Sequence, residues 1–118
     1  MIISLAARLE GPLNIRPDPA FVTIGESVTW ELLFDPQGST FRVPLKWEIY
    51  FQDKDPFSLS NGRAWIARSE PNSNGEHKEM LDVGEAREPG DYKYGVRIAN
   101  AESGEELSDD DPRLIVRG

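Results

Sequence analysis

Large apolar side chains alternate with polar ones along residues 41–52, and this alternation constrains the fold more than any other feature. The apolar positions are Phe41, Val43, Leu45, Trp47, Ile49 and Phe51. Successive side chains of a strand point to opposite faces, so the pattern predicts a strand with one buried and one solvated face. Pro44 has no backbone N–H and therefore places this strand at a sheet edge or at a bulge.

The same alternation recurs at residues 28–34 and 92–98, and shorter strands are predicted at 21–24, 64–68, 78–83 and 113–117. Asn74-Gly75 lies between two of these strands and predicts a hairpin. Polar residues 53–62 and 100–112 are expected to form long loops. No helical period is sustained. These features predict an all-β protein, a single Greek-key β-sandwich of about seven or eight mainly antiparallel strands.

The chain has 118 residues, and we expect residues 1–118 to form one domain, because half this length buries too small a core. It contains no cysteine, which excludes disulfides, thiol nucleophiles and thiolate metal ligands. No secretory signal is visible, so a cytoplasmic location is favoured. No apolar run approaches the roughly 20 residues of a membrane helix, so membrane insertion is not expected.

The formal net charge is −8, and acidic residues gather near the C-terminus. Nucleic-acid binding requires clustered lysine and arginine side chains that neutralise phosphates. Basic residues here are scattered singly among acids. The charge pattern therefore argues against nucleic acid as a partner and against an anionic membrane surface.

Two segments justify a comparison with a known family. Residues 15–30, which end in Gly25-Glu26-Ser27-Val28-Thr29-Trp30, resemble the opening strands of cupredoxins. Pro89-Gly90-Asp91-Tyr92-Lys93-Tyr94 resembles the cupredoxin strand that leads to the copper cysteine. The resemblance covers about half of the chain and implies the sandwich topology.

The copper ligands that this resemblance would imply are missing. A blue-copper site requires two histidines, a cysteine thiolate and a weak axial ligand. Val96 stands roughly where the cysteine would be, and no histidine lies near residues 41–43. Copper electron transfer is therefore excluded, and no cofactor is expected.

An immunoglobulin-like sandwich is the alternative. Glu88-x-Gly90-x-Tyr92 is similar to the tyrosine-corner signature, and Trp47 is a candidate core tryptophan. Both families share the sandwich architecture, and neither resemblance carries a function to this chain.

His77 is the single histidine, and it follows the Asn74-Gly75 turn. It could act as a general base with a neighbouring carboxylate in a hydrolase. No nucleophile-elbow motif accompanies it, so an exposed surface histidine is expected and an enzyme is not.

Residues 105–111 are rich in carboxylates, which are the ligands that Ca²⁺ prefers. The candidate ligands are Glu105, Asp109, Asp110 and Asp111. Their spacing does not follow the EF-hand pattern, so a solvated acidic loop is the expected structure.

The tryptophans raise the question of carbohydrate binding, because aromatic faces stack on sugar rings. Trp30 and Trp47 lie in phase with apolar strand faces and are expected in the core. Trp65 is the tryptophan that could be exposed, and Tyr50 lies on the polar face of its strand. Together they would form a ligand patch if they shared an outer face.

The sequence therefore predicts a non-enzymatic β-sandwich that works by binding, with a protein partner or a second copy of itself as the leading expectation. Exposed sheet edges are the expected docking element. The alternative is a small-ligand binder, of Ca²⁺ at residues 105–111 or of a carbohydrate near Trp65.

Overall fold

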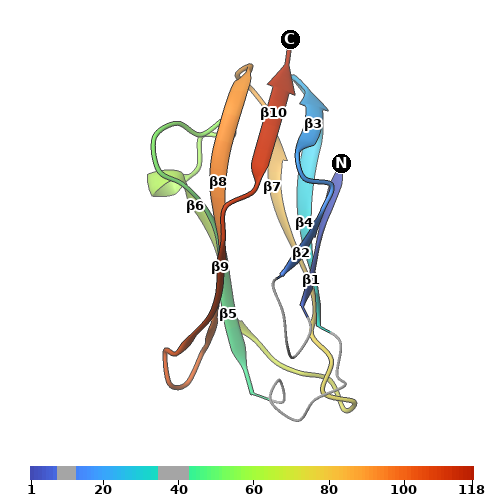
Figure 1. Ribbon diagram of the computed structural model, residues 1–118, viewed down its shortest axis with the longest axis vertical. Coiled ribbons are helices and arrows are strands. Elements are labelled where there is room, and N and C mark those ends of the chain that lie inside the picture. The colour runs from blue at the N-terminus through green and yellow to red at the C-terminus, as the bar shows by residue number, and fades with distance from the viewer. Residues whose placement is uncertain (8–12, 35–42) are drawn as a thin grey trace.

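The computed structural model describes residues 1–7, 13–34 and 43–118. In these residues ten strands form two sheets that pack face to face (Figure 1). The helical element among them is a 3-10 turn, η2 (Ser60–Gly62), and no helix there is long enough to cross a membrane. The predicted all-β sandwich is confirmed. The strands are β1 (Ile2–Ala7), β2 (Asn14–Arg16), β3 (Ala20–Thr23), β4 (Ser27–Phe34), β5 (Leu45–Phe51), β6 (Arg63–Ser69), β7 (Lys78–Glu85), β8 (Gly90–Asn100), β9 (Glu106–Asp110) and β10 (Arg113–Arg117).

The smaller sheet has the order β2-β1-β4-β7, and the larger has the order β3-β10-β8-β5-β6. Strand β10 pairs with residues 90–93 of β8, and β9 pairs with residues 96–99 of the same strand. The two short strands therefore follow one another along β8. Most pairs are antiparallel, but β1 runs parallel to β4 and β3 runs parallel to β10. Mainly antiparallel pairing is thus confirmed.

The core lies between the sheets and contains the inward residues of both. Trp30 on β4 and Trp47 on β5 are buried as predicted, with exposed fractions of 0% and 1%. The Trp30 Nε1 donates a hydrogen bond of 3.2 Å to the Tyr94 hydroxyl on β8, which belongs to the other sheet. Phe51 and Phe57 pack against the same pair of rings, so an aromatic cluster joins the two sheets.

Tyr92 forms the tyrosine-corner contact that its sequence predicts. Its hydroxyl donates to the Glu88 carbonyl oxygen at 3.0 Å, at the entrance to β8. Burial raises the pKa of this phenol, which stays a hydrogen-bond donor at physiological pH. The corner therefore fixes the start of the longest strand, β8.

Three details of the sequence-based interpretation are wrong. Pro44 does not mark an edge strand, because it precedes β5, and β5 lies between β8 and β6 in the larger sheet; the register shift between Leu45 and Trp47, next to Pro44, fits the other predicted alternative, a bulge. Asn74-Gly75 forms the predicted tight turn, with Gly75 at φ 80°, but β6 and β7 belong to different sheets and form no hairpin. The segment 100–112 is not all loop, because it contains β9. Residues 41 and 42 lie outside the described residues.

We expect Trp30→Phe to destabilise the protein more than Trp47→Phe, by about 1 kcal/mol. Both changes remove similar volume, but the first also takes a donor away from the buried Tyr94 hydroxyl. The Trp47 Nε1 has no hydrogen-bond partner in the described part of the chain. Denaturant unfolding of both variants measures the difference, and an equal or greater loss in Trp47→Phe would contradict it.

Candidate functional site

The outer face of the larger sheet gathers the polar side chains of four strands. Glu48 on β5 lies opposite Trp65 of β6 on one side and opposite Arg97 of β8 on the other. Arg97 in turn lies opposite Asp109 of β9. Residues that pair directly across strands share a face, so these side chains form one continuous surface. We call the surface of β6, β5, β8 and β9 that faces away from the core the outer face.

Arg97 is the centre of an ion-pair network on the outer face. It contacts Glu48 at 3.0 Å, Glu106 at 3.2 Å and Asp109 at 3.8 Å, and Glu48 also contacts Arg63 at 3.8 Å. Burial by itself lowers the pKa of Arg97, but Glu48 and Asp109 outweigh it and raise the pKa. The side chain of Glu48 is only 14% exposed, so its contacts are screened less by solvent than those of an open surface pair.

Tyr50 lies flat across Gly95 on the outer face. A Cβ atom added to Gly95 would come within 2.0 Å of the Tyr50 ring. The Tyr50 hydroxyl donates to Asp109 at 2.7 Å, and the Arg97 guanidinium stacks on its ring at 5.0 Å. Burial and the hydrogen bond to Asp109 raise the pKa of Tyr50. The absence of a side chain at position 95 therefore makes room for the ring that links β5 to β9.

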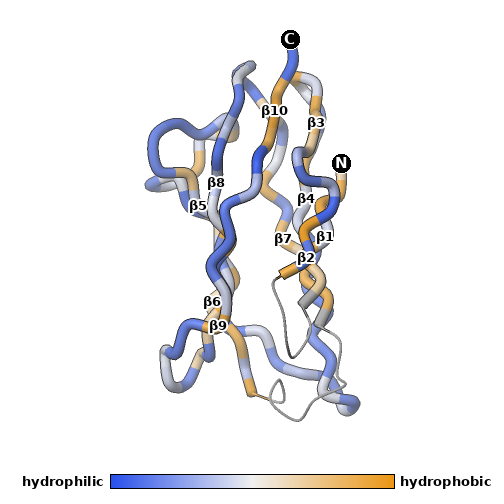
Figure 2. Tube along the Cα trace, in the orientation of Figure 1, coloured by the Kyte–Doolittle hydropathy of each residue, from blue (hydrophilic) through white to orange (hydrophobic). Residues whose placement is uncertain are grey.

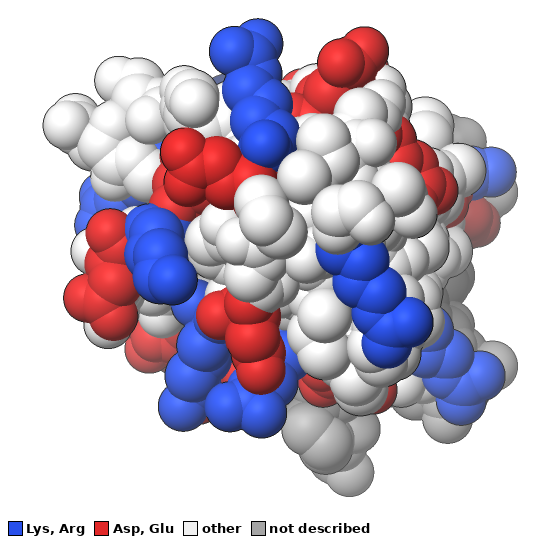
Figure 3. Space-filling view, turned by 90° about the horizontal axis from the view of Figure 1, so that it is seen from above, with Lys and Arg blue, Asp and Glu red and all other residues white. Residues whose placement is uncertain are grey.

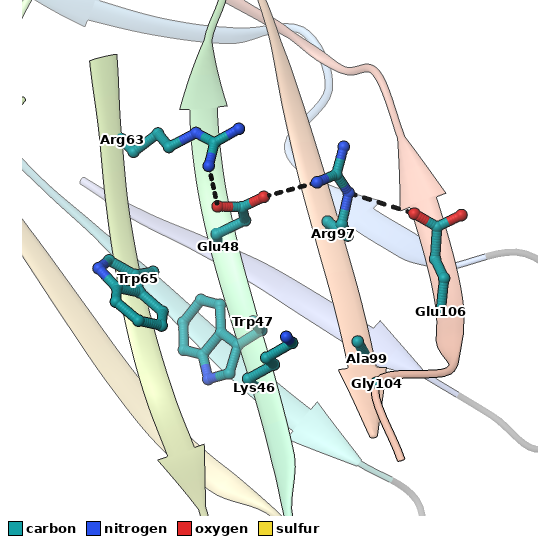
Figure 4. Close-up of a pocket in the computed structure, with 9 residues that line it drawn as sticks. All are labelled: Lys46, Trp47, Glu48, Arg63, Trp65, Arg97, Ala99, Gly104 and Glu106. Carbon is teal, nitrogen blue, oxygen red and sulfur yellow. Dashed lines mark hydrogen bonds and ion pairs between the residues drawn. The ribbon is translucent and has the colours of Figure 1, made fainter. Parts of the chain in front are cut away.

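A hollow of about 500 Å³ opens beside Trp65 on the outer face (Figure 4). Trp65 borders it from β6, and Figure 4 shows Arg63, Glu48, Arg97 and Glu106 following one another across the strands above it. The lining residues are Lys46, Trp47, Glu48, Arg63, Trp65, Arg97, Ala99, Gly104 and Glu106. The hollow thus combines one exposed aromatic ring with ordered charged groups.

Trp65 and Tyr50 share the outer face, as the carbohydrate hypothesis requires. Trp65 is 59% exposed, the largest exposed fraction among the large apolar side chains of the described residues. Tyr50 is half-buried and lines a second hollow of about 400 Å³ with Asp109, Asp110 and Asp111. The two rings therefore border neighbouring hollows rather than one.

The four calcium candidates do not converge on one point. Asp109 accepts from Tyr50, Asp110 accepts from Ser108, and Asp111 pairs with Lys93. Because Asp109 and Asp110 are adjacent in β9, their side chains point to opposite faces of the strand. Glu105 is exposed in the turn before β9, and the described residues contain no group of three or more metal-ligating side chains. The placement gives calcium binding no support.

His77 is not the exposed histidine that the sequence analysis expects, because it is 1% exposed. Its Nε2 lies 3.1 Å from the Val43 carbonyl oxygen, which can only accept, so Nε2 donates. Its Nδ1 lies 3.0 Å from the hydroxyl of Ser69, which is also buried and lies 3.3 Å from Glu79. Both ring nitrogens thus join β6 to the segment before β5, and this placement supports a structural role.

The sequence could not reveal the ion-pair network around Arg97, although the alternation along β5 indicated which side chains of that strand point outward. Strand alternation places Lys46, Glu48 and Tyr50 on one polar face. The partners Arg97 and Asp109 lie about 50 and 60 residues later, and only strand register brings them opposite Glu48 and Tyr50. Nothing in the sequence indicated that Gly95 makes room for an aromatic ring, because Tyr50, the residue that lies over it, is distant in sequence.

Comparison with known proteins supports the fold and no function. No protein-family model matches the chain, and no curated protein matches it. Nine solved chains match its structure, among them reduced rusticyanin. That match covers 98% of this chain and 78% of the rusticyanin chain, with 15% sequence identity and a TM-score of 0.52. The fold is therefore cupredoxin-like, as the resemblance of residues 15–30 and 89–94 implies.

The residues at the positions where the cupredoxin resemblance would place copper ligands do not fit a copper centre. Val96 is completely buried in β8 and offers no ligand atom. The single histidine of the chain, His77, bonds through both ring nitrogens to Ser69 and Val43. The chain has no cysteine to supply a thiolate. The topology is shared, but the donor set of a blue-copper site is missing.

Gly95→Ala should lower the free energy of unfolding by about 1–3 kcal/mol, because the new methyl group displaces the Tyr50 ring. In a Tyr50→Ala background the same change should cost less than about 0.5 kcal/mol, since the ring is gone. Equilibrium denaturation of the four proteins completes the double-mutant cycle. Equal costs in both backgrounds would show that the ring does not lie over Gly95.

His77→Ala should lower the free energy of unfolding by about 2–4 kcal/mol, because it leaves buried polar partners without a hydrogen bond and opens a cavity. Lys78→Ala is the matched control: the neighbouring side chain is exposed, and we expect a change within about 0.5 kcal/mol. Urea unfolding followed by circular dichroism compares them. A stability loss as small as that of the control would refute the structural role.

Proposed function

We propose that this protein is a non-enzymatic binding module and that the outer face around Trp65 is its binding surface. The observation that carries the proposal is the 59% exposure of Trp65 beside an ordered, charged hollow. An exposed large aromatic ring with fixed polar groups around it is typical of binding surfaces. The partner expected from the sequence is another protein or a second copy of the chain.

The edge strands are less suited to pairing with a partner strand than the sequence analysis expects. Strand β2 has three residues, and β3 has four and follows two prolines, Pro17 and Pro19. Strand β6 has a register shift opposite Leu45 and Trp47, and β7 has one opposite Val28 and Thr29. Short strands, prolines and bulges are the features by which proteins block edge-to-edge pairing. We therefore place binding on the outer face and not on an edge.

Other exposed apolar side chains are scattered. Ile2 and Met80 lie on the smaller sheet, and Phe21 and Ile24 lie near the end that carries the C-terminus. At that end basic and acidic side chains are intermixed (Figure 3). Strand β9 and the short connection from it to β10 are hydrophilic along most of their length (Figure 2). None of these four apolar side chains lines either of the two hollows described above.

A small ligand is the second candidate, and the hollow beside Trp65 favours it. Its volume of about 500 Å³ is within the ordinary range for ligand sites. A ligand there and a protein partner on the same face both depend on Trp65.

If the partner is a second copy, Trp65→Ala should convert a dimer into a monomer in sedimentation velocity, since it removes the main apolar contact. Met80→Ala is the matched control, because Met80 is 55% exposed but lies on β7 of the other sheet. It should leave association unchanged. If the wild type is monomeric, tagged wild type and both variants are compared in partner capture. Equal behaviour of all three proteins in association, capture and ligand binding would refute the outer face as the binding surface.

A further inference from the structure

We propose that the hollow beside Trp65 binds a sugar ring of a neutral oligosaccharide. This inference rests on the proposed function, which makes the outer face the binding surface, and it names the ligand class. A pyranose ring has an apolar face of C–H groups and an edge of hydroxyl groups. A complementary site therefore needs an aromatic platform next to polar groups that both donate and accept hydrogen bonds.

The shape of the hollow meets the first requirement. Trp65 on β6 stands at its border with 59% of its surface free. Ala99 on β8 and Gly104 in the turn before β9 also line the hollow, and their small size leaves room beside the indole. A ring stacked on Trp65 would cover apolar surface that no other described residue covers.

The charged groups meet the second requirement. Glu48 lies between Arg63 and Arg97, and Arg97 continues to Glu106 (Figure 4). Guanidinium groups donate in a planar fork, carboxylates accept through two oxygens, and each sugar hydroxyl can do both. Because the ion pairs already fix these side chains, a ligand would order few of them on binding.

The charge of the hollow argues for a neutral ligand. Three cations line it, Lys46, Arg63 and Arg97, against two carboxylates, Glu48 and Glu106. Asp109 next to Arg97 brings the local balance to zero, and the whole chain carries −8. A polyanion would gain no net local attraction and would be repelled by the rest of the chain.

The same ring of charges argues against an apolar protein anchor in the hollow. The buried centre of a protein interface is depleted of charged residues. Here five charged side chains surround one exposed indole. Burying them under an apolar side chain would remove their hydration, whereas sugar hydroxyls replace the water that they lose.

The test is a titration with cellohexaose, laminarihexaose, xylohexaose and chitohexaose, each free in solution, followed by the three indole N–H signals in NMR. We expect saturable binding of at least one hexasaccharide, with a shift of the Trp65 indole signal, identified by its loss in Trp65→Ala. The signals of the buried Trp30 and Trp47 should move less. A heparin hexasaccharide is the anionic comparison and should not bind.

Variants separate this inference from the proposed function. Trp65→Ala should weaken saccharide binding at least about tenfold, whereas Met80→Ala should leave it unchanged. Thermal melts confirm that both variants are folded. If no neutral saccharide binds the wild type but association or capture depends on Trp65, the saccharide inference is overturned and the binding surface stands. Saccharide binding that is unchanged in Trp65→Ala, or preference for the heparin fragment, also overturns the inference.

Discussion

The contact between Trp30 and Tyr94 joins the two sheets, and the rest of the structure depends on it. Trp30 comes from the smaller sheet and Tyr94 from the larger, and the indole N–H donates to the phenol in the middle of the core. Burial raises the pKa of Tyr94 far above its ordinary value, so the hydroxyl stays neutral and satisfies the indole donor. Phe51 and Phe57 close around the pair. With the core fixed in this way, β5 and β8 can present their other faces to solvent.

The side chains on the outer face come from the residues of each strand that point away from the core, and strand register decides which of them become neighbours. Glu48 and Arg97 are neighbours only because β5 and β8 pair in one register, and a slip of β5 by one residue would turn Glu48 toward the core and away from Arg97. The Tyr50 ring over Gly95 and its bond to Asp109 fix β9 to the same surface. The fold and the outer face therefore depend on the same register, and Trp65 is exposed because it lies opposite Glu48 on the face of the sheet that points away from the core.

The rusticyanin match shows that a similar sandwich is built from a very different sequence. The two chains share a sandwich with 15% sequence identity, and the likeness concerns the fold alone. In residues 89–94, where this chain resembles cupredoxins, the motif makes a structural contact: the Tyr92 hydroxyl donates to the Glu88 carbonyl oxygen and fixes the entrance to β8. Val96 then adds one more apolar residue to the core. The contacts that join the strands and sheets of this sandwich include aromatic packing and strand pairing.

The sequence by itself determined the class of the fold, because period-two alternation dictates which residues can face a core: it identified Trp30 and Trp47 as buried and the Asn74-Gly75 turn correctly. It did not reveal that β1 is a central strand, that β5 is interior despite Pro44, or that residues 106–110 form β9. It also placed His77 on the surface, although Ser69 and Val43 enclose it. Each of these depends on which strands become neighbours, and pairing between distant segments is decided by packing of the whole chain. The outer face around Trp65 exists only in the tertiary structure, since its residues come from four strands between positions 46 and 109.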